Sequence, residues 1–158
     1  MSVHNVTWYA TSSGVSSTEA IAAALNWLTG GEAEISREKV KSYHGARMTM
    51  LRAQIDRKKA ARESIPHLGA QLLSHLAQSD DLIARIDEEN VLHIRLDISS
   101  LVRGSIELSE GFEEQVKGRI KLEVYPGQDV LENARKMLES SSIIATELGL
   151  PNPIIDSE

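Results

Sequence analysis

Apolar and polar residues alternate with a period of two in several parts of the chain, which is the pattern of a strand with one covered face. It is clearest at 115–125, where charged residues separate the apolar positions. The same pattern predicts strands at 3–11, 35–43, 91–98 and 105–108, and one that follows a turn at 43–46 and ends at Ile55. Because successive side chains of a strand point to opposite faces, an antiparallel sheet with one wet face is predicted.

Apolar residues at helical spacing predict the elements that cover the other face. The predicted helices are 16–28, 57–76, 79–86 and 129–148. Ser16 with Glu19, and Asp129 with Glu132, have the spacing of capping boxes, while Pro66 must kink or restart the second helix. The predicted fold class is therefore α+β, a mostly antiparallel sheet with helices packed on one face.

Composition narrows the class of protein further. A chain of 158 residues suits one domain, predicted at 1–150 with a C-terminal tail at 151–158. Cysteine is absent, which excludes disulfides, thiolate metal sites and cysteine nucleophiles. No apolar run approaches the roughly 20 residues of a membrane span, and the N-terminus lacks the features of a signal peptide. A cytoplasmic protein without a membrane partner is expected.

Positive charge is concentrated in one stretch of this acidic chain. Between Arg37 and Arg62, nine of the seventeen Lys and Arg residues stand with two acids, a formal charge of about +7, whereas the remainder carries about −13. This asymmetry builds a local positive potential and favours a polyanion as partner. Lys and Arg on the solvent side of strands also prevent aggregation, so a merely solvated face is the alternative.

The basic residues gather on one surface if the polar sides of the strands share the open face. The bases predicted there are Arg37, Lys39, Lys41, Arg52, Arg95, Lys117, Arg119 and Lys121, with Tyr43, His93 and Tyr125 among them. The RNA-binding set is completed by Arg47, Arg57, Lys58, Lys59 and Arg62, and by Tyr43 and His44 as rings for stacking. Phosphate pairing by Lys and Arg with base stacking on aromatic rings is how sheets recognise RNA. Bases at the predicted start of the second helix oppose its dipole, a conflict that can mark function.

Sequence patterns of catalytic and metal sites are lacking. The five histidines, His4, His44, His67, His75 and His93, show no metal-site spacing. The glycine-rich phosphate loops and the nucleophile elbow are absent from the sequence. His44 could serve as the general acid–base group of a nuclease only with a carboxylate that no defensible spacing supplies. We therefore predict no enzyme, no catalytic residue, no metal and no cofactor.

Three segments carry a resemblance to a known family. The stretches YHGARMTMLRAQIDRKKAA, RIDEENVLHIRLD and IKLEVYPG, in this order, resemble an archaeal family of predicted RNA-binding proteins. Its members are described as uncharacterised proteins or as exosome subunits, and the resemblance extends from the first strand to about Leu138. Relatives often have His-His-Gly-Asn where this chain has Tyr43-His44-Gly45-Ala46. The resemblance implies RNA as partner and a fold similar to the large-subunit ribosomal protein that binds 5S RNA.

Charge, strand pattern and resemblance together predict a non-enzymatic RNA-binding protein, associated with RNA processing or the exosome. The alternative is a module for dimerisation or protein interaction whose sheet face pairs with a second copy or with an RNA-processing complex, since Tyr and Arg are favoured at interfaces. A metal-dependent nuclease is a third, weaker alternative.

Overall fold

The computed structural model describes residues 3–12, 15–41, 47–111 and 114–152. The strands are β1 (Val3–Ser12), β2 (Glu34–Lys41), β3 (Arg47–Ile55), β4 (Val91–Asp97) and β5 (Gln115–Leu122). The α-helices are α1 (Val15–Leu28), α2 (Lys58–Ser64), α3 (Ala70–Gln78), α4 (Ile98–Val102) and α5 (Val130–Leu148), and two short 3-10 helices are η1 (Ile65–Leu68) and η2 (Leu82–Arg85). In the described chain the five strands form one sheet in the order β2-β3-β1-β5-β4, and every neighbouring pair is antiparallel.

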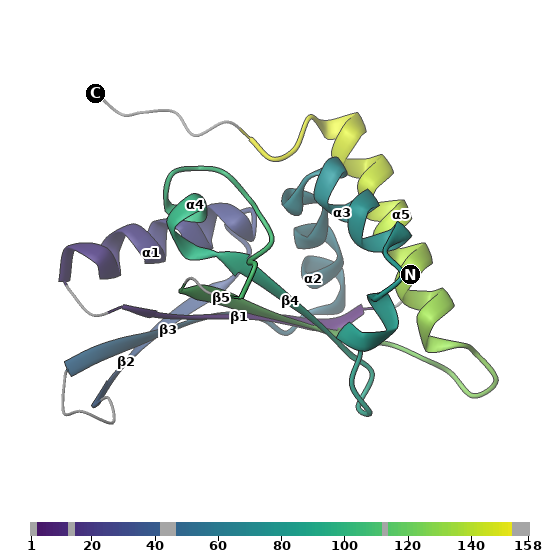
Figure 1. Ribbon diagram of the computed structural model, residues 1–158, viewed down its shortest axis with the longest axis horizontal. Helices are drawn as coiled ribbons and strands as arrows, with labels where there is room; N and C mark the ends of the chain where they lie inside the picture. Colours follow the sequence, from purple (N-terminus) through teal and green to yellow (C-terminus); the bar gives the residue numbers. More distant parts are fainter. Residues whose placement is uncertain (1–2, 13–14, 42–46, 112–113, 153–158) are drawn as a thin grey trace.

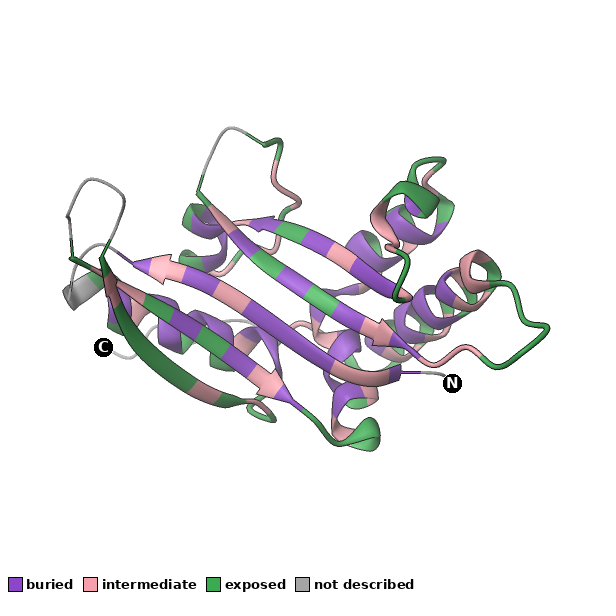
Figure 2. Cartoon of the chain, turned by 90° about the horizontal axis from the view of Figure 1, so that it is seen from below, coloured by how far each residue is buried: buried purple, intermediate pink, exposed green. Residues whose placement is uncertain are grey.

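The helices lie on one side of the sheet (Figure 1). α1 and α4 cover one half, and α2, α3 and α5 cover the other. The opposite side of the sheet carries no helix in the described part of the chain (Figure 2). This arrangement confirms the predicted α+β class with helices on one face of an antiparallel sheet.

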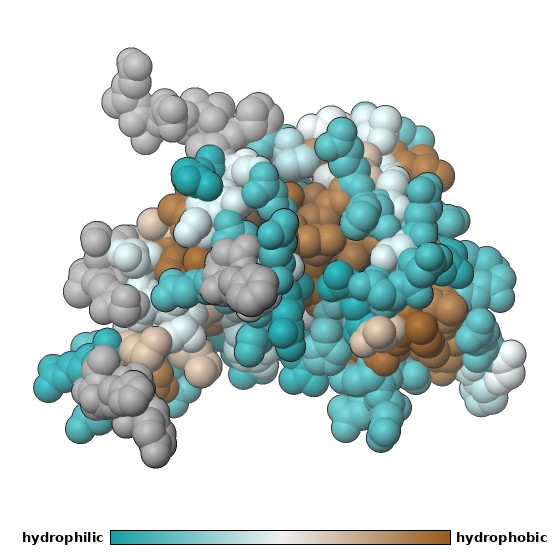
Figure 3. Space-filling view, viewed as in Figure 1, coloured by the Kyte–Doolittle hydropathy of each residue, from teal (hydrophilic) through white to brown (hydrophobic). Residues whose placement is uncertain are grey.

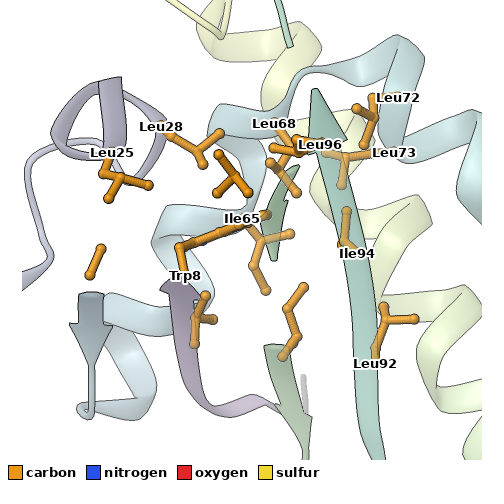
Figure 4. Packing of buried hydrophobic residues seen from close by; sticks show 14 of the residues in the cluster. Trp8, Leu25, Leu28, Ile65, Leu68, Leu72, Leu73, Leu92, Ile94 and Leu96 are labelled. Atoms are coloured by element: carbon orange, nitrogen blue, oxygen red, sulfur yellow. The ribbon is translucent and has the colours of Figure 1, made fainter. Parts of the chain in front are cut away.

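The core lies between the sheet and this helix layer. Trp8 is 3% exposed, and Figure 4 shows it together with Leu28 of α1, Ile65 of η1 and Ile94 of β4. Seen along the sheet edge, hydrophobic residues gather above the sheet, between the regions of α4 and α3, while its lower rim is mostly hydrophilic (Figure 3). The hydrophobic effect therefore fixes which side of each strand faces the helices.

The sequence placed most elements correctly, although the helix predicted at 79–86 is the shorter η2 and the strand predicted at 115–125 is the shorter β5. Three further differences are larger. The helix predicted over 57–76 is divided into α2, η1 and α3, with Pro66 in the first turn of η1 and Gly69 at a positive φ of 92° before α3. The strand predicted at 105–108 is reduced to one bridge between Leu96 and Leu108. The connection after β4 instead contains α4, because the Asp97 carboxylate caps it by accepting a hydrogen bond from the Ser100 amide.

Candidate nucleic-acid interface

The register of the sheet decides which side chains share the open face. Residues directly opposite each other in an antiparallel pair lie on the same face. Tyr9 stands opposite Arg52 on one side and Lys117 on the other. Lys117 in turn stands opposite Arg95 of β4. Trp8, the neighbour of Tyr9, points into the core, so this row of four residues lies on the face that no helix covers (Figure 2).

Five of the predicted bases gather on this surface, which we call the open-face patch. Its members are Arg52, Arg95, Lys117, Arg119 and Lys121. All except the half-buried Lys121 are exposed. The ion pairs of the described residues include none of Arg95, Lys117 or Arg119. The centre of the patch thus has unbalanced positive charge.

The prediction that Arg37, Lys39 and Lys41 share this face is wrong. Arg37 stands opposite Leu51, which is fully buried beneath the helices, so this set of β2 side chains points to the helix side. Arg37 accordingly forms an ion pair with Glu19 of α1, whose pKa is lowered by the hydrogen bond from the guanidinium.

The error has a physical reason. β2 is an edge strand and is exposed on both faces along most of its length, so polar residues do not identify its outward side. Ile35 has the same parity as Arg37 and stands opposite buried Ala53, which is the signal that could have oriented the strand. Arg47 stands opposite Lys41 and lies on the helix side as well.

His93 lies on the open face, as predicted. Its Nε2 is 2.7 Å from Oδ2 of Asp87, and this hydrogen bond is the main cause that lowers the pKa of the Asp87 carboxyl. His93 stands directly opposite Arg119. Asp87 therefore fixes the ring at the rim of the open-face patch.

The bases at the start of α2 lie in the helix layer rather than on the open face (Figure 1). Arg57 takes the N-cap position, Lys59 is exposed and Arg62 is half-buried. Lys58 Nζ lies 2.9 Å from Oε2 of Glu123, and the pairing raises the pKa of Lys58. A carboxylate that follows β5 thus offsets the dipole conflict expected at Lys58.

The prediction that Tyr125 lies among the open-face bases is wrong. Tyr125 lies beyond the end of β5, where its hydroxyl donates a hydrogen bond to Glu123. The prediction extended β5 by three residues, because the alternation of apolar and polar residues continues past Leu122. Tyr43 and His44 fall outside the described residues, so their role in stacking stays a prediction.

Glu123 gives a test of this cluster by pH. The hydroxyl of Tyr125 and then the ammonium of Lys58 lower the pKa of its carboxyl from the ordinary 4.5. A depressed carboxyl pKa contributes stability that is present above the unfolded pKa and is lost as pH falls through the folded pKa. We expect Glu123→Gln to lower the melting temperature near neutral pH and the difference from wild type to shrink below pH 4.5. Thermal unfolding followed by circular dichroism measures both, with Glu139→Gln on the exposed face of α5 as control.

Sequence reasoning missed Tyr9. It lines an open depression of about 310 Å³ at the centre of the sheet face, together with Arg52, Arg119 and Lys121. The Arg52 guanidinium carbon lies 5.7 Å from the centroid of the Tyr9 ring, the distance of a cation–π contact. The signal was present, since Tyr9 has the parity opposite to the apolar side chains of Val6 and Trp8.

Other kinds of site find no support in the described ranges. No group of three or more His, Asp or Glu side chains there could hold a metal ion. Within the same ranges, none of the helices combines the length and the apolar character needed to cross a bilayer.

The fold and the open-face patch define an α+β protein with one basic, uncovered sheet face. The family model described as RNA binding matches residues 6–124, and the chain belongs to this RNA-binding family. None of the curated proteins compared with the chain matches it.

Solved archaeal structures are similar over nearly their whole length. A DUF54 protein from Methanothermobacter thermautotrophicus has 30% identity and a TM-score of 0.71, covering 88% of this chain and 100% of that one. A DUF54 protein from Archaeglobus fulgidus has 27% identity and a TM-score of 0.66, covering 85% and 99%. A UPF0201 protein from Methanococcus jannaschii, at 10% identity and a TM-score of 0.57 over 85% and 98%, shares the fold alone. The archaeal family indicated by the three sequence segments is thereby confirmed.

Proposed function

We propose that the protein binds RNA through the open-face patch and carries out no chemistry on it. The main observation is the direct opposition of Arg95 and Lys117 without a carboxylate between them. Like charges directly opposite each other in a sheet are destabilising. The phosphodiester backbone of an RNA bound across the strands would relieve this repulsion, and the RNA would release counterions on binding.

The neighbourhood of these bases favours RNA over a generic anion. Tyr9 lies between Arg52 and Lys117, so one aromatic ring stands among the cations, as it does where sheets bind RNA. Membership of the RNA-binding family supports the same partner. Arg37 and Lys58 are already paired with carboxylates, and we expect them to contribute less.

The proposed place in RNA processing, with the exosome as the complex concerned, rests on the family resemblance alone. The proposed cytoplasmic location rests on the composition, which has no cysteine and no apolar run of membrane-spanning length. The proposed similarity of the fold to that of the large-subunit ribosomal protein that binds 5S RNA also rests on the family resemblance.

The charge pattern of β2 argues against one kind of dimer, in which the β2 edges of two copies pair and extend the sheet, and it does not bear on a dimer that pairs through the open face. A two-fold axis perpendicular to the sheet pairs residues of equal parity across the new strand pair. An axis at Glu38 places the Glu38 residues of the two copies opposite each other, and Arg37 of each copy opposite Lys39 of the other. Every centre from Ser36 to Val40 places at least one pair of like charges opposite each other, which is unfavourable.

Salt dependence tests the proposed function. We expect labelled RNA to bind with a dissociation constant whose logarithm changes linearly with the logarithm of salt concentration. Each phosphate neutralised on a single strand contributes about −0.7 to the slope of the association constant, so the five bases allow at most about −3.5. Fluorescence anisotropy at a series of salt concentrations measures this slope, and negligible binding at low salt would exclude the proposal.

A further inference from the structure

We infer that the depression beside Tyr9 holds one unpaired nucleotide, so that the protein prefers single-stranded RNA to duplex RNA. This inference rests on the proposed function and names the form of RNA that the open-face patch takes. The depression has a volume of about 310 Å³, at the lower end of the range for sites that enclose a small organic molecule, roughly 300–1,000 Å³.

One part of the depression presents a flat, cationic surface. The Arg52 guanidinium lies over the Tyr9 ring, 5.7 Å from its centroid. Gln54 Oε1 accepts a hydrogen bond of 3.0 Å from Nε of Arg52 and so restrains the guanidinium. Bases that have left a stack pack on aromatic rings and on guanidinium planes alike. Tyr9 and Arg52 therefore form a preformed surface for a single base.

The cations on β5 suit the phosphate of the same nucleotide. Arg119 stands two residues from Lys121 on the same face, and both line the depression. Lys121 Nζ donates to the carbonyl oxygen of Glu89, which holds the ammonium at the rim without neutralising it. A base against Tyr9 and a phosphate at Arg119 and Lys121 together match the aromatic and the cationic parts of the depression.

Asn5 completes the site on its polar side. It stands opposite Lys121 and lines the depression, and the hydrogen bonds of the described residues do not engage its side-chain amide. A side-chain amide both donates and accepts, which is what the edge of an unpaired base requires. By contrast, Gln54 is occupied by Thr7, Arg52 and Asp56.

A duplex cannot use this site in the same way. Bases in an A-form helix are stacked on both faces, so none is available to pack on Tyr9. A duplex would reach only the cations, through its phosphates, and would bind by charge alone. The binding free energy thus has two parts. Phosphate contacts give a salt-dependent part that both forms of RNA share, and stacking on Tyr9 gives a part that only an unpaired base gains.

The test compares Tyr9→Leu, Tyr9→Phe and wild type on one labelled RNA, single-stranded or annealed to its complement. We expect wild type to bind the single strand more tightly. Tyr9→Leu should weaken single-strand binding by about 5- to 150-fold, the range for loss of one base–aromatic stack, with the salt slope and duplex binding unchanged. Tyr9→Phe keeps the ring and should bind as wild type does. All three should unfold at similar temperatures, because Tyr9 lies on the wet face.

The outcomes distinguish this inference from the proposed function. Salt-dependent binding of wild type with no loss in Tyr9→Leu overturns the nucleotide site and leaves RNA binding standing. Equal or tighter binding of the duplex by wild type also overturns the nucleotide site alone. Absence of binding to either form overturns both.

Discussion

Replacing Lys117 and Arg119 together by glutamate is expected to weaken RNA binding by more than about 100-fold at physiological salt. The change removes two phosphate contacts from the centre of the open-face patch and adds two charges that repel the backbone. Fluorescence anisotropy with single-stranded RNA measures the loss. The slope of the logarithm of the association constant against that of salt concentration should become less negative by at least about 1.4, because each lost contact on a single strand contributes about 0.7.

The same variant should keep or gain stability, which separates lost binding from lost folding. Lys117 stands opposite Arg95, so the glutamate at position 117 faces a guanidinium across the strand pair in place of a like charge. Opposite charges in directly opposed positions are favourable, by roughly 0.2–1 kcal/mol. We expect a melting temperature equal to or above that of wild type, measured by thermal unfolding.

A matched control lies on the other face of the sheet. Lys39→Glu with Lys41→Glu changes the net charge by the same amount, but both side chains point to the helix side of β2. If RNA lies on the open face, this control should change affinity by less than about fivefold, since screened charges act weakly beyond a Debye length of about 8 Å. Equal losses in the two variants would contradict the assignment of RNA to the open face.

The sequence predicted the strands that have one clearly apolar side. In β4 and β5 the apolar side chains that share one parity are buried as expected: Leu92, Ile94, Val116 and Ile120. The alternation alone therefore places Arg95, Lys117, Arg119 and Lys121 on the opposite, open face. The α+β class followed from the same patterns combined with the helical spacing of the remaining apolar residues.

Two features of the site required the structure, because they depend on contacts between distant residues. The side of β2 depends on its pairing with β3, because within β2 the apolar Ile35 and Val40 have opposite parities and only the partner of Ile35, buried Ala53, marks the helix side. The neutralisation of Lys58 depends on Glu123, which is 65 positions away in the sequence. Tyr9 could have been found from parity, but its contact with Arg52 depends on the pairing of β1 with β3.

On the helix side of the sheet, a contact between Trp8 of β1 and Gly118 of β5 positions the open-face patch. Gly118 lies between Lys117 and Arg119, and its register partner Trp8 precedes Tyr9. A Cβ added at Gly118 would lie 2.3 Å from Cζ3 of the Trp8 ring. Because β1 and β4 pair with β5 on both sides, the backbone at Gly118 has little freedom to retreat. The close contact of the indole with this glycine thus holds together the strands that carry Tyr9 and the two bases.

Gly118→Ala is therefore expected to lower the free energy of unfolding by about 1–3 kcal/mol, the range for overpacking a well-packed core. Trp8→Phe removes the outer ring atoms that the new methyl would meet, and on its own leaves a cavity. The two changes should compensate, so the double variant should lose at least about 0.5 kcal/mol less than the sum of the single losses. Urea denaturation of the wild type and the three variants measures this coupling. Strictly additive losses would show that the methyl is accommodated elsewhere and that Trp8 does not fix the position of β5.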